Sequence, residues 1–394
     1  MRRNEAAAVN PVPTLLERAR LVAAEIAENA AALDRSGAFP AENIARVHRA
    51  GLSALTAPRT LGGRDAGFLD VYQVIGAIAE AEPSTALILS MQYIHLRTLL
   101  RSRAPSHLVE KVVASAVEDG ALINALRVEP DLGTPLRGGL PATTAARTAD
   151  GWRISGRKIY STGAAGLSWA WVWARTDEDE PRVGGFLVPM AARGIRIEPS
   201  WDQLGMRATA SDDVVFDGVE VPADHAADIR LPQGWGPPEG AQAVLHALLV
   251  PAIYDGVARA ARNWLTGFLN ARRPSNLGDT LASLPRIQQA VGEIEEKLAV
   301  NRRLLRSVAA EADAGEYLSA SEAALIKLTV TENAIAATEI ALKLSGNHGV
   351  SRSNPLERHY RNVLCGRIHS PQEDSARQQA GRIALTPDTK GAAQ

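Results

Sequence analysis

The sequence is poor in cysteine and in net charge. Its 394 residues include one cysteine, Cys365, which excludes an internal disulfide framework and indicates a reducing compartment. Lys and Arg number 43 against 44 Asp and Glu, so no basic field could hold nucleic acid or an anionic membrane surface. No Cys/His cluster has the spacing of zinc ligands. We therefore expect small molecules and other protein subunits as partners, and neither nucleic acid nor a membrane.

Long apolar runs and the common nucleotide and hydrolase signatures are also missing. The N-terminus "MRRNEAAAVNPVPTLLERAR" has no continuous apolar segment, and no run approaches the about 18 apolar residues of a membrane span, so we expect a cytoplasmic protein. The sequence has no G-x-G-x-x-G after a strand, no Walker loop, no G-x-S-x-G and no H-E-x-x-H. These absences exclude the usual sites for nicotinamide, nucleoside triphosphate, acyl-serine and zinc chemistry.

The patterns that are present change along the chain from helical to β-type and back. Helical periodicity begins after Thr14, which has capping-box spacing with Glu17, and continues to about residue 118. Short β-type runs such as "WRISGRKIY", "WAWVWART" and "DDVVFDGVEVP" follow and indicate a small antiparallel sheet. We expect domains at 1–121, 122–230 and 231–394.

The C-terminal third is expected to be helical again after the Pro/Gly-rich segment "LPQGWGPPEG". One helix face is predicted by the spacing of Ile287, Val291, Ile294 and Leu298. A further long helix should start after Ser319, which is spaced for capping with Glu322, and end at Ser345 and Gly346.

Three features can carry chemistry, each with a simpler structural alternative. In "YSTGA" (160–164), hydroxyls and backbone N–H groups could bind the polar edge of a flat heterocycle. The alternative is that this segment is an ordinary hairpin turn. The glycines of "SGNHGVSRSNP" would allow a phosphate to approach the backbone, or they simply end a helix. His95 and His246 lie on apolar helical segments typical of core histidines, whereas His369 lies in the loop "GRIHSPQED" and is the better candidate for chemistry.

Several longer motifs together give the chain a recognisable pattern. In order they are "LGGRDAG", "VEPDLG", "DGWRISGRKIYSTGA", "WDQLGMRATASDDVVFDGVEVP" and "GNHGVSRSNPLERHYRN". With these motifs the chain resembles the acyl-CoA dehydrogenase superfamily from about residue 14 to about residue 388. The resemblance implies an α+β fold with an N-terminal all-α domain, a central antiparallel β-barrel and a C-terminal four-helix bundle.

The resemblance also implies a flavin cofactor and an oligomer. Tyr160, Ser161 and Thr162 would lie at the flavin ring, and a neighbouring subunit of a homo-oligomer, usually a tetramer, would bring its phosphate-side residues. The residues assigned to that side are Arg273, Lys343, Gly346, Asn347, Gly349, Gln372 and Asp374. The family's Arg-x-x-Phe-Gly segment appears as "RRPSNLGD", with Pro274 at the arginine position. This change favours FMN over FAD, and the flavin would be reduced by a separate NAD(P)H:flavin reductase.

The acid that such dehydrogenases use to remove an α-proton is missing. Ser370 falls at the usual glutamate position, and His246 falls at the alternative position on the first long helix of the C-terminal domain. A hydroxyl does not ionise near neutral pH, so Ser370 cannot be the base. We assign both residues to the substrate pocket.

Where the motifs of this chain differ from the dehydrogenase pattern, they resemble those of two-component (group D) flavin monooxygenases, such as dibenzothiophene and sulfone monooxygenase-like proteins. That resemblance implies oxidation of a small molecule at sulfur, nitrogen or activated carbon with reduced flavin and O2. His369, with a pKa near neutrality, would act as general acid/base or peroxyflavin-orienting group, Ser161 at the flavin edge, and His95 as a second catalytic histidine. The alternatives are an acyl-CoA dehydrogenase or oxidase with a non-standard base, and a catalytically silent flavin-binding paralogue.

Overall fold

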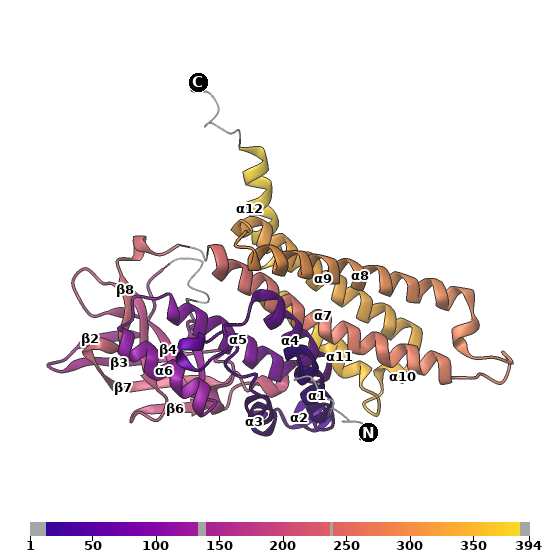
Figure 1. Cartoon of the computed structure of the whole chain (residues 1–394), viewed down its shortest axis with the longest axis horizontal. Helices are drawn as coiled ribbons and strands as arrows, with labels where there is room; N and C mark the ends of the chain where they lie inside the picture. The colour runs from indigo at the N-terminus through magenta and orange to yellow at the C-terminus, as the bar shows by residue number, and fades with distance from the viewer. Residues whose placement is uncertain (1–12, 133–138, 237–238, 387–394) are drawn as a thin grey trace, which may run out of the picture.

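The computed structural model describes residues 13–132, 139–236 and 239–386. Helices come first, an eight-stranded sheet follows, and a second set of helices completes the chain (Figure 1). The helices of both sets lie side by side, and the sheet occupies one end of the molecule. The predicted fold class is thereby confirmed.

The N-terminal part contains six α-helices among the described residues. They are α1 (Leu15–Ala27), α2 (Ala30–Ser36), α3 (Ala41–Arg49), α4 (Phe68–Ala81), α5 (Pro83–Leu100) and α6 (Ser106–Glu118). The predicted capping box is present, because Thr14 accepts from the backbone N–H of Glu17 while Glu17 accepts from that of Thr14. Glu82 caps α5 in a similar way, and Pro83 occupies the first turn.

The central part forms one sheet with the strand order β6-β7-β3-β2-β4-β5-β8, and β1 pairs with β4 beside this path. The strands are β1 (Leu122–Leu126), β2 (Thr144–Arg147), β3 (Gly151–Lys158), β4 (Leu167–Thr176), β5 (Val183–Pro189), β6 (Ile195–Glu198), β7 (Asp213–Pro222) and β8 (Ala226–Arg230). Most pairs are antiparallel, as expected, but β1 and β2 both run parallel to β4. Neither strand is joined to β4 by a tight hairpin. Two parallel strands need a longer crossover connection, and both pairs have one. The expectation of a purely antiparallel sheet was therefore wrong.

The C-terminal part is dominated by three long helices. Its helices are α7 (Gly240–Ala271), α8 (Pro285–Asp313), α9 (Ala320–Ser345), α10 (Asn347–Val350), α11 (Leu356–Leu364) and α12 (Glu373–Leu385), with a short 3-10 helix at Cys365–Ile368. Ser319 caps α9 by accepting from the N–H of Glu322, as predicted. Ile294 and Leu298 of the predicted α8 face are buried, and α12 projects away from the bundle (Figure 1).

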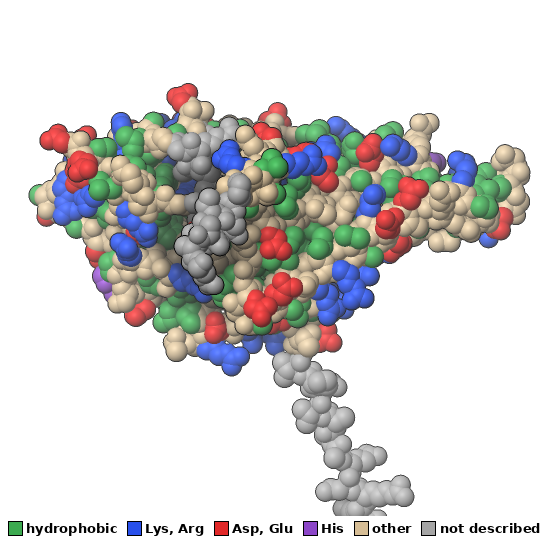
Figure 2. Space-filling model, turned by 90° about the horizontal axis from the view of Figure 1, so that it is seen from above, with side chains coloured by type: hydrophobic (Ala, Val, Ile, Leu, Met, Phe, Trp, Pro, Cys, Tyr) green, Lys and Arg blue, Asp and Glu red, His purple; other side chains and the backbone are tan. Residues whose placement is uncertain are grey.

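Helix α7 passes the length and hydropathy test for a membrane span, contrary to the expectation that no run would. However, 89% of its most apolar window is buried inside the structure, where it packs against α4, α5, α9 and α11. A helix that is apolar all round is what a core position requires. On the outside, Figure 2 shows acidic and basic side chains interspersed on the face seen from above.

Contacts between the parts fix how they meet. Asp313, at the end of α8, accepts from the first two backbone N–H groups of α4, those of Phe68 (2.6 Å) and Leu69 (3.0 Å). A carboxylate at a helix N-terminus satisfies otherwise unpaired donors and is favoured by the helix dipole. A second contact joins the bundle to the β6–β7 connection, where Asn362 of α11 accepts from the N–H of Met206 at 2.7 Å. The sheet is thus tied to the bundle next to the loop that follows α11.

Candidate functional site

The loop 160–164 between β3 and β4 is held in an unusual backbone conformation. Tyr160 has a φ of 55° and Gly163 a φ of 77°, both in the left-handed region, which is uncommon for tyrosine. Asn124 of β1 donates to the carbonyl of Thr162 at 3.0 Å, and the N–H of Gly163 donates to the carbonyl of Thr209 at 2.8 Å. Because neighbouring segments over-determine this turn, its hydroxyls are fixed in place.

Two hydroxyls of this loop are left with free hydrogen-bonding capacity. The Ser161 side chain is 1% exposed, and its Oγ has no partner among the described residues. Thr162 Oγ1 accepts from Ser211 at 3.1 Å, and no described residue accepts its own proton. Buried polar groups are normally paired, so the unpaired Ser161 hydroxyl in a fixed turn indicates a ligand. Two hydroxyl donors are of the kind that could hold the polar edge of a flavin ring.

His369 is held by two residues that sequence reasoning missed. Its Nε2 lies 2.6 Å from the hydroxyl of Tyr254 on α7. The buried ammonium of Lys327 on α9 donates to the carbonyls of His369 (2.8 Å), Gly366 (3.2 Å) and Pro371 (3.3 Å). These bonds fix the loop and point the imidazole toward α7. A single lysine inside the apolar run "ALIKLTV" was the available signal for Lys327.

Burial keeps the three candidate histidines neutral near pH 7. It lowers the pKa of His369 to about 4, helped by the charges of Lys327 and His246. It lowers the pKa of His246 to about 4 and that of His95 to about 3. The expected near-neutral pKa of His369 is therefore not found, because a desolvated imidazole resists taking up a proton.

The same electrostatic couplings show which residues lie near one another. His246 lowers the pKa of both His95 and His369, and Arg127 lowers the pKa of His95 and of His246. These residues come from α5, α7, the loop before α12 and the end of β1. We call His95, His246 and His369 the histidine cluster. The structure thus brings together three histidines, of which His95 and His369 are separated by 274 positions in the sequence.

Arg127 is a third residue that sequence reasoning missed. Its guanidinium lies 4.5 Å from the ring centroid of Trp173, and its buried Nε has no hydrogen-bond partner among the described residues. The residue precedes "VEPDLG", whose glutamate, Glu129, forms a fully buried ion pair with Lys158 at 2.6 Å. Thr143 and the N–H of Ala142 complete the acceptor sites of Glu129. That motif therefore joins β1 to β3.

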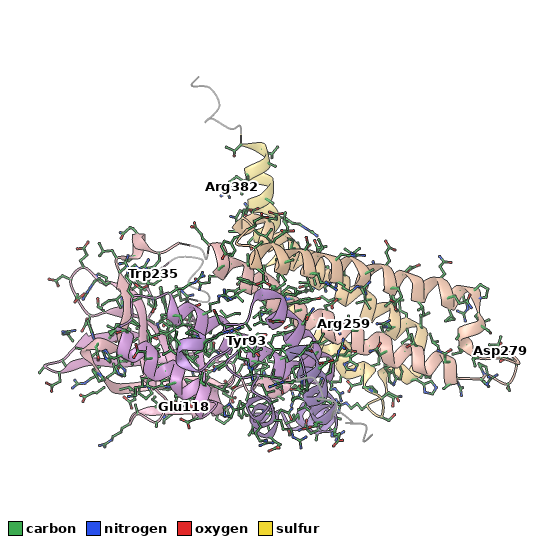
Figure 3. The ribbon with its side chains drawn as sticks, viewed as in Figure 1. Tyr93, Glu118, Trp235, Arg259, Asp279 and Arg382 are labelled. Atoms are coloured by element: carbon green, nitrogen blue, oxygen red, sulfur yellow. The ribbon has the colours of Figure 1, made fainter. Side chains whose placement is uncertain are left out.

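Five of the seven predicted phosphate-side residues lie at the end of the helical bundle, away from the sheet that carries the flavin-edge loop. Arg273 lies in the α7–α8 connection and pairs with Asp279 at 3.5 Å, at the tip of the bundle away from the sheet (Figure 3). Lys343 pairs with Glu339 at 3.2 Å near the end of α9. Gly346, Asn347 and Gly349 follow at α10 in the same region (Figure 1). One chain does not bring these residues to Ser161.

The remaining predicted residues surround His369 in sequence. Ser370 is exposed, and its peptide bond to Pro371 is cis. Gln372 is the N-cap residue of α12, and Asp374 accepts from the N–H of Ser375 in the first turn. Among the described residues, the exposed hydroxyl of Ser370 makes no hydrogen bond to the histidine cluster.

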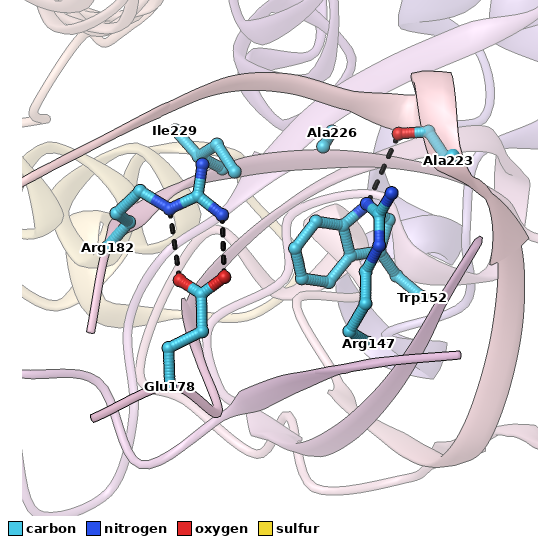
Figure 4. A pocket seen from close by; sticks show the side chains of 7 residues that line it. All are labelled: Arg147, Trp152, Glu178, Arg182, Ala223, Ala226 and Ile229. Carbon is cyan, nitrogen blue, oxygen red and sulfur yellow. Dashed lines mark hydrogen bonds and ion pairs between the residues drawn. The ribbon is translucent and has the colours of Figure 1, made fainter. Parts of the chain in front are cut away.

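A separate hollow of about 420 Å³ is lined by residues of β2, β3, β8 and the β4–β5 connection (Figure 4). Arg182 forms a two-pronged ion pair with Glu178 there, and Arg147 lies over the ring of Trp152 at 4.7 Å. Arg182 and Glu178 satisfy each other, and none of the residues that line the hollow belongs to the histidine cluster. It is a feature of the sheet surface.

A helical domain, a β domain and a helical bundle in this order are the architecture of a class of flavoprotein oxidoreductases. Profiles of the acyl-CoA dehydrogenase N-terminal, middle and C-terminal domains match residues 15–102, 128–219 and 248–373. The chain is 34% identical over 368 residues to the Bacillus subtilis acyl-CoA dehydrogenase-named protein YdbM, covering 92% of this chain and 93% of that protein. This chain belongs to the acyl-CoA dehydrogenase superfamily.

Other relatives have names that differ from the dehydrogenases. The chain is 30% identical over 377 residues to L-evernosamine nitrososynthase of Micromonospora, covering 88% of this chain and 83% of the relative. The structure of KijD3 with FMN and an amino-keto sugar nucleotide has a TM-score of 0.82 at 28% identity, covering 96% of each chain. Butyryl-CoA dehydrogenase from Megasphaera elsdenii has a TM-score of 0.83 at 20% identity, covering 96% of this chain and 100% of that one. At that identity the last similarity shows the fold alone.

Proposed function

We propose that this protein is the oxygenase component of a two-component flavin-dependent monooxygenase, which oxidises a small molecule at sulfur, nitrogen or activated carbon. The observation that supports the proposal is the neutral histidine cluster, which contains His246, at one position where the sequence resemblance places a carboxylate base, and His369, next to the other at Ser370. An imidazole whose pKa is about 4 is a poor base for removing an α-proton. As a neutral group it remains a good hydrogen-bond donor, which oxygen chemistry in a buried site requires.

Each residue has a separate role in this proposal. Ser161 and Thr162 hold the polar edge of the flavin, which supplies the redox chemistry with O2 when it is bound in reduced form. Because Tyr254 occupies Nε2 of His369 at 2.6 Å, Nδ1 is the ring nitrogen left to bind a reacting group. When the Tyr254 hydroxyl donates to Nε2, the proton of the neutral ring is on Nδ1, and His369 presents a donor. His95 is a second neutral histidine of the same site.

The similarity to oxygenases supports the proposal. A nitrososynthase oxidises nitrogen by its name, and KijD3 binds FMN. FMN, a separate NAD(P)H:flavin reductase and a homotetramer that completes the phosphate side of the site are parts of the same proposal. The distance between Ser161 and the group around Gly346 within one chain is the reason to expect a neighbouring subunit there.

A second function is favoured by one observation. The relative from B. subtilis, at 34% identity, is named as an acyl-CoA dehydrogenase. A dehydrogenase of this kind would need a base other than the three histidines. A catalytically silent flavin-binding paralogue would use neither oxygen nor a thioester.

Stopped-flow mixing of the FMN-loaded, photoreduced protein with oxygenated buffer tests these functions. We expect a transient near-ultraviolet absorbance that belongs to neither reduced nor oxidised flavin, and no anaerobic bleaching of the oxidised flavin by acyl-CoA thioesters. Direct reoxidation together with thioester bleaching would establish a dehydrogenase instead. Direct reoxidation without bleaching would leave the silent paralogue.

A further inference from the structure

The register of the sheet places Arg127 beside Trp173 on the face that α5 covers. Strand β1 runs parallel to β4 with Ala125 opposite Trp171 and Leu126 opposite Val172, so the next pair along is Arg127 and Trp173. Alternate strand residues point to the same face. The guanidinium lies over the Trp173 ring at 4.5 Å, as this register requires.

The charge of Arg127 has no counterion in the structure. No carboxylate among the described residues lies within ion-pair distance, and its Nε is buried without an acceptor. The nearby buried acid, Glu129, is already bound by Lys158 and Thr143. The segments 133–138 and 237–238 contain no Asp or Glu. The half-buried guanidinium of Arg127 stays charged, and a charge partly removed from water is costly unless an anion neutralises it.

The neighbours of Arg127 cannot supply that negative charge. His95 and His246 are neutral near pH 7, because burial lowers their pKa values. Trp171, one pleat along β4 on the same face, has a buried indole N–H that also lacks an acceptor. The Nε of Arg127 and the indole N–H of Trp171 are two donors on one face of the sheet, and no described residue accepts from either, so their acceptors are water or a ligand.

We propose that Arg127 is a substrate-binding residue that pairs with a carboxylate or similarly anionic group, so that the substrate of this enzyme is an anionic small molecule. The inference rests on the proposed function, because it assigns the substrate of that site. Guanidinium groups bind carboxylates through two parallel hydrogen bonds, which fix orientation as well as affinity. The anion would thereby be oriented beside the histidine cluster.

Calorimetric titration with benzoate and with its neutral analogue benzamide tests the inference, using the full chain both as apoprotein and loaded with FMN. We expect benzoate to bind at least about ten-fold more tightly, a difference of about 1.4 kcal/mol. Arg127→Met should abolish this preference, and Arg127→Lys should retain part of it. Because arginine stays protonated, the preference should persist from about pH 6 to 9.

A matched control exists in the same sheet. Arg147 also lies over a tryptophan, Trp152, at 4.7 Å, but on the other side of the sheet. Arg147→Met should leave the benzoate preference unchanged. Equal binding of benzoate and benzamide to the native protein would overturn the inference. So would Arg127→Met weakening FMN binding while keeping the benzoate preference, because the cation would then serve the flavin.

These outcomes are independent of oxygen chemistry. The titrations contain no reductant, so a protein that prefers benzoate but shows no transient on reoxidation would keep the anion site and lose the monooxygenase function. The reverse combination would keep the monooxygenase and remove Arg127 from substrate binding.

Discussion

The hydroxyl of Tyr254 and Nε2 of His369 lie 2.6 Å apart, which joins the middle of α7 to the loop before α12. The two rings are tilted by 44° with centroids 5.6 Å apart, so the contact is a directed hydrogen bond. Tyrosine at this position gives His369 a single orientation. The pair is therefore the first place to test the proposed chemistry.

Tyr254→Phe should alter flavin reoxidation in the same direction as His369→Ala while leaving the fold intact. Removing the hydroxyl frees the imidazole to rotate, so the transient in the stopped-flow trace should decay at least about ten-fold faster, equivalent to about 1.4 kcal/mol. Because both residues act through one contact, the double variant should be no faster than His369→Ala alone. Native-like decay in Tyr254→Phe would show that the tyrosine only packs.

Ser161→Ala should weaken FMN binding without destabilising the apoprotein. The Ser161 hydroxyl is buried and unpaired in the free chain, and an unsatisfied buried hydroxyl contributes nothing to folding. Loss of one hydrogen bond to the flavin should raise the FMN Kd roughly ten-fold, or about 1.4 kcal/mol. Fluorescence quenching of FMN measures the affinity and urea unfolding the stability.

The control for that experiment is Ser155→Ala in β3. The Ser155 hydroxyl accepts from the N–H of Gly218 at 3.2 Å on the exposed side of the sheet, so its removal should not change the FMN Kd. If Ser161→Ala binds FMN as tightly as the native protein does, the hydroxyl does not contact the flavin.

Lys158→Met should destabilise the apoprotein by about 3–5 kcal/mol, because it leaves Glu129 as an unpaired charge in the interior. The two side chains are 0% and 2% exposed and 2.6 Å apart. Adding Glu129→Gln should recover part of the loss, since the buried charge is removed. Urea unfolding of the three proteins measures the coupling, and a loss below about 1 kcal/mol in Lys158→Met would contradict a buried ion pair.

The free energy of unfolding should fall as the pH falls from about 6.5 to 4. The folded-state pKa values are about 3 for His95 and His359 and about 4 for His246 and His369. The unfolded chain, with histidine pKa values of about 6.5, therefore takes up protons first, which favours unfolding. Above pH 6.5 both states are neutral at these residues, and their contribution is constant.

In His95→Asn, unfolding near pH 5 should take up about one proton fewer than in the native protein. This difference is measured as a smaller slope of the unfolding free energy against pH. The matched control is His107→Asn, since the His107 side chain is 67% exposed and pairs with Asp224 at the surface. An unchanged slope in His95→Asn would mean that His95 is protonated in the folded protein at that pH.

Local sequence patterns were enough to predict the order of the elements and the turn at the proposed flavin edge. The capping pairs Thr14 with Glu17 and Ser319 with Glu322 lie within one helical turn, so local spacing was enough to predict them. The turn at Ser161 was visible because its hydroxyls and glycine stand between two β-type runs. These features depend on neighbours a few residues away.

Which distant residues meet, and how their surroundings shift their pKa values, follows from the packing of the whole chain. No local motif marks Tyr254, Lys327 or Arg127. Tyr254 and Lys327 contact His369, which is 115 and 42 positions away, and Arg127 contacts Trp173, which is 46 positions away. The neutral state of His369 comes from desolvation by helices whose register the sequence does not fix. The parallel pairing of β1 with β4, which sets Arg127 beside Trp173, likewise depends on chain connections and long-range packing.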